Sequence, residues 1–352
     1  MHSFAIGALV FAAIIAAAGG ACAESSRPAA AEIAKAGDIE LGTFTVQFEN
    51  DLFAGTDRNY TNGVRLSWLS PEGGQTLPVL QHARDLLAMI AQDDNRKTRF
   101  GWALGQEIYT PGDRQATRLI TDDRPYAGWL YGALSLHSEV DNGDGAKTSE
   151  SVELSLGIVG PEALGEEAQD FVHSVRLIDK FKGWDNQLKT EPGLLIAYER
   201  RWRFAKPWHL GDTLQWDFVP HAGGSVGNVL THLGLGGAVR VGVNLPDDFG
   251  PPALIHGAST VDRLNEDGIG AYVFATAEGR YVAHNIFLDG NTWRAGHSVD
   301  RVPWVGRFTL GVALEYGRFR IAYTNAVVTE EFEGQQRYSR FGAISTSFQA
   351  FF

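Results

Sequence analysis

Hydrophobic and polar residues alternate along most of the chain, and this alternation predicts β-strands rather than helices. In residues 43–50, for example, Phe44, Val46 and Phe48 fall on one face and polar side chains on the other. Residues 151–158 repeat the pattern. Because successive side chains of a strand point to opposite faces, each segment has one apolar and one polar side.

About twelve such segments follow one another, separated by turn residues. The predicted strands are 43–50, 60–70, 99–109, 127–140, 149–160, 193–203, 213–223, 231–244, 268–281, 306–316, 318–328 and 338–352. Helical spacing is confined to residues 79–90 and 166–181, and residues 245–267 and 282–303 are predicted to be long polar connections. With short turns on one side and long loops on the other, this arrangement is typical of a transmembrane barrel.

Spacing alone does not separate such a barrel from a soluble β-sandwich, but the aromatic residues favour the barrel. Many tryptophans and tyrosines fall near predicted strand ends, where the aromatic girdles of a membrane barrel lie. The last predicted strand ends on Phe351 and Phe352. We therefore predict an all-β, antiparallel transmembrane β-barrel of about twelve strands, with a short amphipathic helix in an extracellular loop.

The first 23 residues lack any charged side chain and contain an apolar run over residues 4–18. Ala21-Cys22-Ala23 resembles a small-residue cleavage site, so residues 1–23 are predicted to be a secretory signal peptide. A membrane anchor is the alternative, although the run is short for a span, and a lipoprotein modified at Cys22 is another. Residues 24–40 are predicted to be a flexible lead-in and residues 41–352 the barrel domain.

Composition narrows the function classes. The chain has 352 residues and a formal net charge of −12, and its acidic balance argues against a nucleic-acid partner. A hydrophobic content of 44% excludes a wholly disordered chain, and one cysteine excludes a disulfide framework. We expect an exported protein with no nucleic-acid partner.

The first polar block, residues 48–63, interrupts the first hairpin. Asn50 and Asp51 close one predicted strand, and Thr61 opens the next. A hairpin would bring a carboxylate, an amide and a hydroxyl to one rim, and such oxygen ligands suit Ca²⁺ rather than Zn²⁺. The alternative is a polar hairpin stabilised by its own turn hydrogen bonds.

The second block comprises residues 108–111 and 121–129. Its neighbouring Asp123 and Arg124 could hold a loop over the rim through a charge-assisted bond. A purely structural role is equally open, because Pro125 and Gly128 would shape the turn into the next strand.

The third block runs from Gly160 through the predicted helix. Its helical spacing puts one set of side chains on a polar face and another on an apolar face. The polar set is Gln169, His173 and Arg176, and the apolar set is Phe171, Val175 and Ile178. Such a helix could lie against the outer wall of a barrel or cap its mouth. His173 has the chemistry of a general base, whereas a bystander role is the simpler alternative.

Other catalytic patterns are absent from the sequence. It contains no G-x-S-x-G serine motif and no H-E-x-x-H or C-x-x-C zinc spacing. A serine nucleophile and a zinc site are therefore disfavoured.

These blocks, in this order, resemble the lipid A 3′-O-deacylase family of outer-membrane β-barrels. The E-N-D-x-F…D-x-x-Y-T-N-G block is the most specific part, and Ile-Tyr-Thr-Pro, Asp-Arg-Pro-Tyr-Ala-Gly-Trp and Ile-Val-Gly-Pro-Glu reinforce it. The resemblance covers about residues 40–190 and, weakly, the aromatic C-terminus. It implies a twelve-stranded barrel with a Ca²⁺-dependent esterase site at the extracellular rim, next to a loop helix.

Carried over by position, the resemblance assigns roles to single residues. His173 matches the general-base histidine, and Asn50 and Asp51 match the paired rim residues. Thr61 matches the hydroxyl after a tyrosine, and Gln169 a polar neighbour one turn before the histidine. The implied catalytic set is therefore His173, Asn50, Asp51, Thr61 and Gln169, and the implied metal set is Asp51, Thr61 and Asp179.

Two positions depart from the family pattern. Asp179 stands where the family has a glutamate near the metal. No lysine occurs between Gly112 and Arg124, where the family has a catalytic lysine, and the cations there are Arg114, Arg118 and Arg124. An arginine is not an equivalent proton donor.

The expected function is hydrolysis of the 3′-linked acyl or acyloxyacyl ester of lipid A in the outer membrane of a Gram-negative bacterium. His173 would activate water against a Ca²⁺-polarised carbonyl. The expected substrate is lipopolysaccharide, the expected cofactor is Ca²⁺, and the expected state is a monomer surrounded by outer-membrane lipid. The alternatives are a phospholipase-type esterase and a non-catalytic structural barrel or porin.

Overall fold

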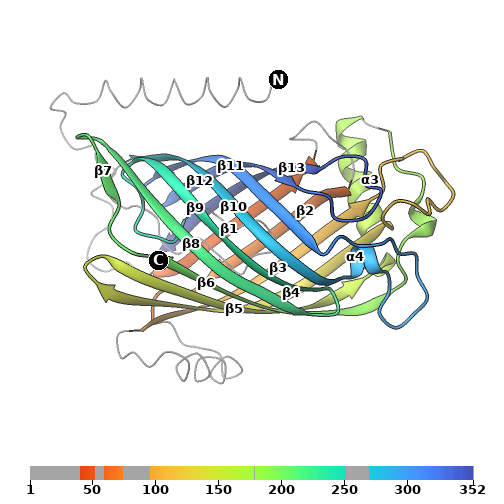
Figure 1. Ribbon diagram of the computed structural model, residues 1–352, viewed down its shortest axis with the longest axis horizontal. Helices are drawn as coiled ribbons and strands as arrows, with labels where there is room; N and C mark the ends of the chain where they lie inside the picture. Colours follow the sequence, from red (N-terminus) through yellow and green to blue (C-terminus); the bar gives the residue numbers. More distant parts are fainter. Residues whose placement is uncertain (1–39, 52–58, 74–95, 178, 251–268, 352) are drawn as a thin grey trace.

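Twelve long antiparallel strands form a closed barrel in the computed structural model, which describes residues 40–51, 59–73, 96–177, 179–250 and 269–351 (Figure 1). The long strands are β1 (Glu40–Asn50), β2 (Asn59–Leu69), β3 (Lys97–Thr110), β4 (Ala127–Gly143), β5 (Ala146–Val159), β6 (Glu191–Arg203), β8 (Leu214–Gly227), β9 (Leu230–Val243), β10 (Ile269–Asn285), β11 (Trp304–Tyr316), β12 (Phe319–Val328) and β13 (Ser339–Phe351). The remaining elements are the helices η3 (Pro161–Ala163), α3 (Gly165–Arg176), η4 (Trp184–Asn186) and α4 (Ile286–Asp289), and the short strand β7 (Trp208–Leu210).

Closure depends on two pairings between distant parts of the chain. The first strand β1 pairs with both β2 and the last strand β13, and β6 pairs with β8 on the opposite side. The short strand β7 pairs only with β8, so it lies outside the ring of twelve. The predicted twelve-stranded antiparallel barrel is confirmed.

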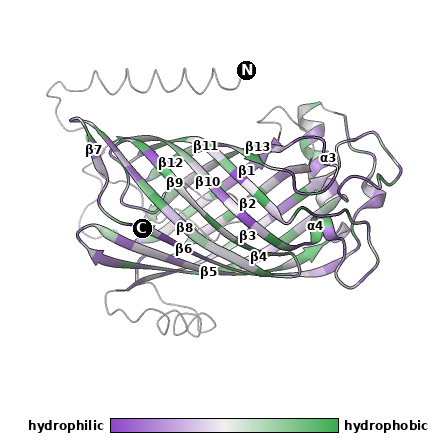
Figure 2. Cartoon of the chain, in the orientation of Figure 1, coloured by the Kyte–Doolittle hydropathy of each residue, from purple (hydrophilic) through white to green (hydrophobic). Residues whose placement is uncertain are grey.

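Each strand presents one face to the lumen and one to the outside. On β1 the side chains of Thr45 and Gln47 are buried, whereas those of Phe44 and Val46 are exposed. Figure 2 shows the same alternation of hydrophobic and hydrophilic colour along the strands around the barrel. The outer surface is therefore apolar, as a lipid-facing wall requires.

Ion pairs line the lumen. Arg65 on β2 lies 2.6 Å from Glu153 on β5, and Arg240 on β9 lies 2.6 Å from Asp217 on β8. Residues 245–250, which follow β9, enter the lumen at the end opposite α3, where Asp248 is buried against Arg240 and Arg320. Polar side chains inside a closed barrel satisfy one another rather than facing lipid.

Helix α4 covers the lumen at the other end. Its residues Ile286, Phe287 and Leu288 are buried, and the Phe287 ring stacks on Tyr109 with centroids 3.9 Å apart. Asn285 caps the helix by accepting a hydrogen bond from the Phe287 N–H, which fixes the turn out of β10. The lumen is thus occupied at both ends.

The distribution of loops corrects one expectation. Figure 1 shows α3 and α4 at one end of the barrel and the C-terminus at the other. Two long connections, residues 70–96 and 244–268, join strands at the end opposite α3, so long connections are not confined to one side. The predicted connection 282–303 begins later than expected, because β10 continues to Asn285 and α4 follows.

The predicted helix 166–181 is present but shorter, as α3. The predicted signal peptide, almost all of the lead-in and the predicted helix 79–90 lie outside the described residues. The lead-in's last residue, Glu40, begins β1. Among the described residues, no helix is both long and apolar enough to span a bilayer.

Candidate functional site

Helix α3 rests on the outer wall of the barrel, near the rim formed by β3 and β4. Gln106, an outward-facing residue of β3, donates to the carbonyls of Ala163 and Leu164 at 2.7 and 3.1 Å. Gly128 on β4 allows the close approach, because a Cβ there would lie 3.1 Å from the Ala163 Cβ and 3.2 Å from the Gly165 nitrogen. Of the two expected positions, outer wall or mouth, the helix takes the outer wall.

The helix turns its polar face toward the barrel. Gln169 and His173, one turn apart, are 3% and 2% exposed, whereas Phe171 is 69% exposed. Gln169 and His173 therefore share a face, as their spacing predicts. The side chains of Val175, Arg176 and Ile178, also assigned to faces from the sequence, lie outside what the structure describes.

The hydrogen bonding of His173 determines its tautomer. Its Nδ1 lies 2.8 Å from the backbone carbonyl oxygen of Asp179. A carbonyl oxygen only accepts, so Nδ1 carries the proton and the lone pair of the neutral ring is on Nε2. Within the described part of the chain, Nε2 has no hydrogen-bond partner. A fixed ring with its lone pair available is the arrangement that a general base requires.

Gln169 is oriented by Trp184 of η4. The indole nitrogen donates to Gln169 Oε1 at 2.9 Å, and because an indole N–H only donates, the amide oxygen must face the tryptophan. The amide nitrogen then faces away, where it is buried without a hydrogen-bond partner among the described residues. The buried face of α3 thus carries one available acceptor, on His173, and one available donor, on Gln169.

An aromatic cluster seats this face of α3 on the barrel. Ile108, Tyr126, Phe181 and Trp184 pack together, and the Phe181 ring lies 5.5 Å from the His173 ring. Burial raises the pKa of Tyr126 to about 12, so its side chain is an uncharged wall at neutral pH. The cluster restricts both the helix and the histidine ring.

Strand register brings the first polar block toward the same place. Asn50 on β1 is opposite Asn62 on β2, and Asn62 is opposite Ile108 on β3. Neighbouring strands are about 4.8 Å apart, so the Asn50 backbone is about 10 Å from Ile108 and the aromatic cluster. Asn50 and Asp51 are 2% and 0% exposed. The predicted rim residues and the helix therefore lie on neighbouring parts of one wall.

Thr61 occupies an irregularity between β2 and β3. Pairing shifts register between Tyr60 and Asn62, which makes Thr61 an extra residue of the bulge kind. Its hydroxyl lies 2.6 Å from that of Thr110, the last residue of β3, and both side chains are buried. The bulge re-aims Thr61 and places two hydroxyl oxygens side by side.

These donors fit a hard cation better than a soft one. Asn50, Asp51, Thr61 and Thr110 offer amide, carboxylate and hydroxyl oxygens, the ligands that Ca²⁺ prefers. Among the described residues, no group of three or more His, Cys, Asp or Glu could hold a metal ion. The Asp179 side chain is exposed, and it is its backbone carbonyl, not its carboxylate, that contacts His173.

Asp123 and Arg124 each hold a loop by a contact of its own, and the expected charge-assisted bond is the one that Arg124 makes. The Asp123 carboxylate accepts from the backbone nitrogens of Gly112 and Arg124. The Arg124 guanidinium instead pairs with Glu331 at 2.9 Å and lies over the Tyr109 ring. The short side chain of Asp123 binds backbone nitrogens of its own loop. The longer side chain of Arg124 extends to Glu331 and so connects two loops that are distant in the sequence.

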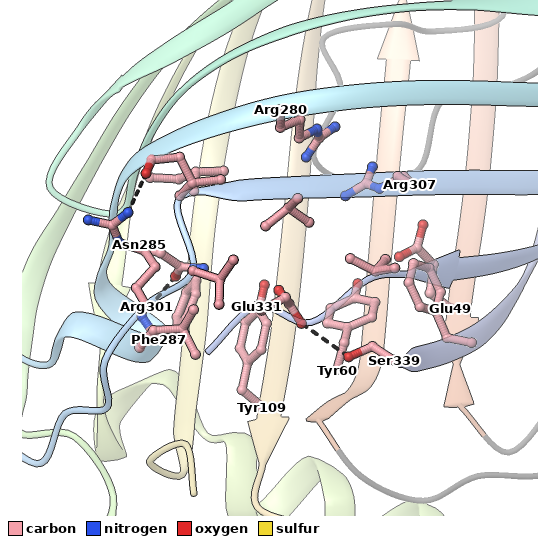
Figure 3. Close-up of a pocket in the computed structure, with 17 residues that line it drawn as sticks. Glu49, Tyr60, Tyr109, Arg280, Asn285, Phe287, Arg301, Arg307, Glu331 and Ser339 are labelled. Atoms are coloured by element: carbon pink, nitrogen blue, oxygen red, sulfur yellow. Dashed lines mark hydrogen bonds between the residues drawn. The ribbon is translucent and has the colours of Figure 1, made fainter. Parts of the chain in front are cut away.

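A cavity inside the barrel is separate from this outer site. Figure 3 shows its lining, which includes Glu49, Tyr109, Arg280, Arg307 and Glu331. Its volume of about 70 Å³ is far below the several hundred that a drug-sized ligand needs, so a glycolipid does not fit. This cavity is therefore too small to hold a lipid.

Sequence reasoning missed two residues of the site, Trp184 and Thr110. Trp184 lies outside the motifs considered in the sequence. The signal that could have found it is its position shortly after the helix, where its indole N–H can donate to the Gln169 amide oxygen. Thr110 belongs to the Ile-Tyr-Thr-Pro motif, but only the bulge at Thr61 brings the two hydroxyls together.

A closed twelve-stranded barrel with a polar site on its lipid-facing side defines an outer-membrane β-barrel protein. The family model described as "Outer membrane protein LpxR" matches residues 9–350, and the chain belongs to this family. Both the predicted family and the predicted location in the outer membrane are therefore confirmed.

One solved structure supports the fold, and a second is only weakly similar. LpxR from Salmonella typhimurium is 20% identical, has a TM-score of 0.69, and the match covers 87% of this chain and 99% of that one. The beta domain of the Bordetella autotransporter BrkA is 8% identical with a TM-score of 0.45, over 89% of this chain and 100% of that one. No curated protein matches the chain in sequence.

Proposed function

We propose that the chain is a lipid A deacylase that hydrolyses the 3′-linked acyl or acyloxyacyl ester. Membership of the LpxR family supports lipid A as the substrate class. The observation that carries the chemistry is the pair on α3: His173 holds Nδ1–H on a carbonyl, and Gln169 turns its amide donor away from Trp184. Both groups lie on the side of the wall that lipid reaches.

The reaction is hydrolysis by an activated water. Nε2 of His173 accepts a proton from water, and the water oxygen bonds to the ester carbonyl carbon. Negative charge then develops on the carbonyl oxygen, where the Gln169 and Asn50 amides donate hydrogen bonds. When the ester C–O bond breaks, His173 returns the proton to the leaving alkoxide. The products are a free fatty acid and a sugar hydroxyl.

We propose Ca²⁺ as the cofactor, with Asp51, Thr61 and Asp179 as its residues and Thr110 as a further oxygen donor. When bound, the ion would supply a positive charge that polarises the ester carbonyl. Asp51 contributes the buried negative charge that a divalent cation requires. The hydroxyls of Thr61 and Thr110 are neutral donors at the end of the β2–β3 pair.

Mass spectrometry of lipid A from a Gram-negative host that expresses the chain tests the proposal. We expect loss of a 3′-linked acyl or acyloxyacyl mass with the native chain, no loss with His173→Ala, and retained loss with His209→Ala, an exposed histidine of β7. Heat-modified mobility on gels checks that each barrel is folded. Unchanged lipid A with a folded native barrel, or normal turnover by His173→Ala, would contradict the proposal.

A phospholipase-type esterase is the second candidate. The absence of a lysine between Gly112 and Arg124 favours it, because the family's catalytic lysine is missing there and an arginine is not an equivalent proton donor. The same host reveals it as lysophospholipid and free fatty acid without any change in lipid A. A porin is disfavoured by the buried ion pairs that occupy the lumen, among them Arg65–Glu153 and Arg240–Asp217.

A further inference from the structure

The amphipathicity of α3 is opposite to that of a helix in water. Its barrel side buries Gln169 and His173, while Phe171 is 69% exposed. The residues that cap the helix are also exposed and apolar: Leu164 is 49% and Leu177 is 94% exposed. A surface helix of a soluble protein buries such side chains and exposes polar ones.

Both caps hold leucine in a backbone conformation that leucine disfavours. Leu164 has φ 56° and ψ 34°, and Leu177 has φ 57° and ψ 42°. These are left-handed values, which glycine and asparagine adopt at much lower cost because they avoid the clash of a bulky Cβ substituent. Two exposed leucines at positions suited to glycine indicate that their side chains have a use outside the folded chain.

The apolar surface of α3 continues that of the barrel wall. Gln106, which holds the Leu164 carbonyl, lies opposite Leu130 on β4 and two residues from Leu104 on β3. Both leucines belong to the lipid-facing side, and they are 38% and 58% exposed. Leu164 thus adjoins the wall, and Phe171, seven residues further, lies on the same side of the helix.

We propose that α3 lies within the outer leaflet of the membrane, with Leu164, Phe171 and Leu177 among the acyl chains of the surrounding lipid. Glu167 and Ser174, which are exposed on the same side as Phe171, place the helix at the boundary between headgroups and acyl chains rather than deeper. An interfacial helix of this kind keeps its apolar residues in lipid and its polar face on the protein.

A position of α3 within the leaflet would also bring lipid to Gln169 and His173, and this consequence rests on the proposed function. Lipid chains that surround α3 reach its edges without leaving the leaflet, and Gln169 and His173 lie on the barrel side of the same helix. The outward leucines and Phe171 would then hold the helix at the depth where ester groups lie, while the buried residues act on those groups.

Site-directed spin labelling tests the membrane contact directly. Cys22 is the only cysteine in the sequence, so a Cys22→Ala background permits single labels. We would label Phe171→Cys in phospholipid vesicles and compare it with Leu104→Cys on the lipid-facing wall and Gln336→Cys in the exposed β12–β13 connection. The label at 171 should match 104, with high accessibility to oxygen and low accessibility to a water-soluble nickel chelate. A label at 171 that behaves like 336 overturns the proposal.

A glycine double variant, Leu164→Gly with Leu177→Gly, tests the consequence for hydrolysis. Glycine suits both backbone conformations, so the fold should be retained while the side chains are lost. We expect the ratio of hydrolysis in lipopolysaccharide-containing vesicles to hydrolysis in detergent micelles to fall about fivefold or more. An unchanged ratio contradicts the role of the leucines. If the native chain hydrolyses no lipid while the label at 171 reports lipid, the proposed function fails and the membrane contact stands.

Discussion

The indole nitrogen of Trp184 lies 2.9 Å from Oε1 of Gln169, and this one hydrogen bond sets the direction of the glutamine amide. The indole cannot accept, so a flipped amide would put two donors face to face. Trp184 is also 2% exposed within the aromatic cluster that seats α3. Trp184 therefore links the packing of the helix to the orientation of the Gln169 amide.

Removing this bond should affect turnover more than folding. Trp184→Phe keeps an aromatic ring in the cluster but loses the donor, and we expect kcat to fall about tenfold with a nearly unchanged KM. Gln169→Leu removes the donor to the developing oxyanion altogether and should cost about a hundredfold in kcat. Steady-state kinetics on solubilised lipid A measures both. Equal kcat values for Trp184→Phe and the native enzyme would show that the amide is held by other contacts.

Removal of Ca²⁺ by a chelator tests the proposed metal independently of the roles proposed for His173 and Gln169. We expect EDTA to abolish hydrolysis and added Ca²⁺ to restore it, because the donor oxygens suit a hard cation. Asp51→Asn keeps the shape of the side chain but removes its charge, so the Ca²⁺ concentration for half-maximal activity should rise at least about tenfold. Asp113→Asn, in the exposed loop after β3, is the matched control. Full activity in EDTA would contradict a resident cation.

The position of α3 should depend on the absence of a side chain at Gly128. A Cβ there would approach both Ala163 and the Gly165 nitrogen, and valine would need still more room. We expect Gly128→Val to displace the helix and reduce activity by at least about tenfold. Gly132→Val, two outward positions further along β4, is the control, since its nearest neighbour would be Leu104 at 3.8 Å. Equal activity of the two variants would mean that helix placement is not critical.

Alternation in the sequence was enough to predict the strands, because period-two patterning gives each strand one apolar and one polar side, and the aromatic residues at the strand ends favoured a barrel over a sandwich. The helical spacing of Gln169 and His173 likewise predicted that they share a face. What spacing could not show is which face turns toward the protein, since that depends on whether water or lipid surrounds the helix. The sequence also could not predict that Arg124 pairs with Glu331, because Glu331 is 207 residues away in the sequence and comes close only in the folded barrel.

The bulge at Thr61 could not be predicted either, because the sequence does not show how two strands pair residue by residue. A single extra residue in β2 turns the Thr61 side chain toward Thr110, and no local sequence pattern indicates this bulge. Conversely, the family resemblance implied that Asn50 and Asp51 would be near the helix, and strand pairing brings Asn50 into line with Ile108. Local chemistry was thus readable from the sequence, whereas long-range partners required the closed sheet.

The segment 245–250 inside the lumen should respond to acid. Burial alone would raise the pKa of Asp248, but Arg240 and Arg320 lower it below its ordinary value. A carboxylate with a depressed pKa contributes stability that is present above its ordinary value of about 3.9 and is lost as pH falls through the folded pKa. The segment should therefore remain in place at neutral pH and loosen only in strong acid.

Conductance through planar bilayers measures this closure. We expect no ion-conducting steps from the native barrel at pH 7 and intermittent openings only in acid below the ordinary aspartate pKa of about 3.9. Asp248→Asn removes one partner of a buried ion-pair cluster, which typically costs about 3–5 kcal/mol, so openings should appear already at pH 7. Glu333→Gln, an exposed carboxylate at the α3 end, should behave like the native chain. If the native barrel conducts steadily at pH 7, residues 245–250 do not close the lumen, and the porin alternative gains support.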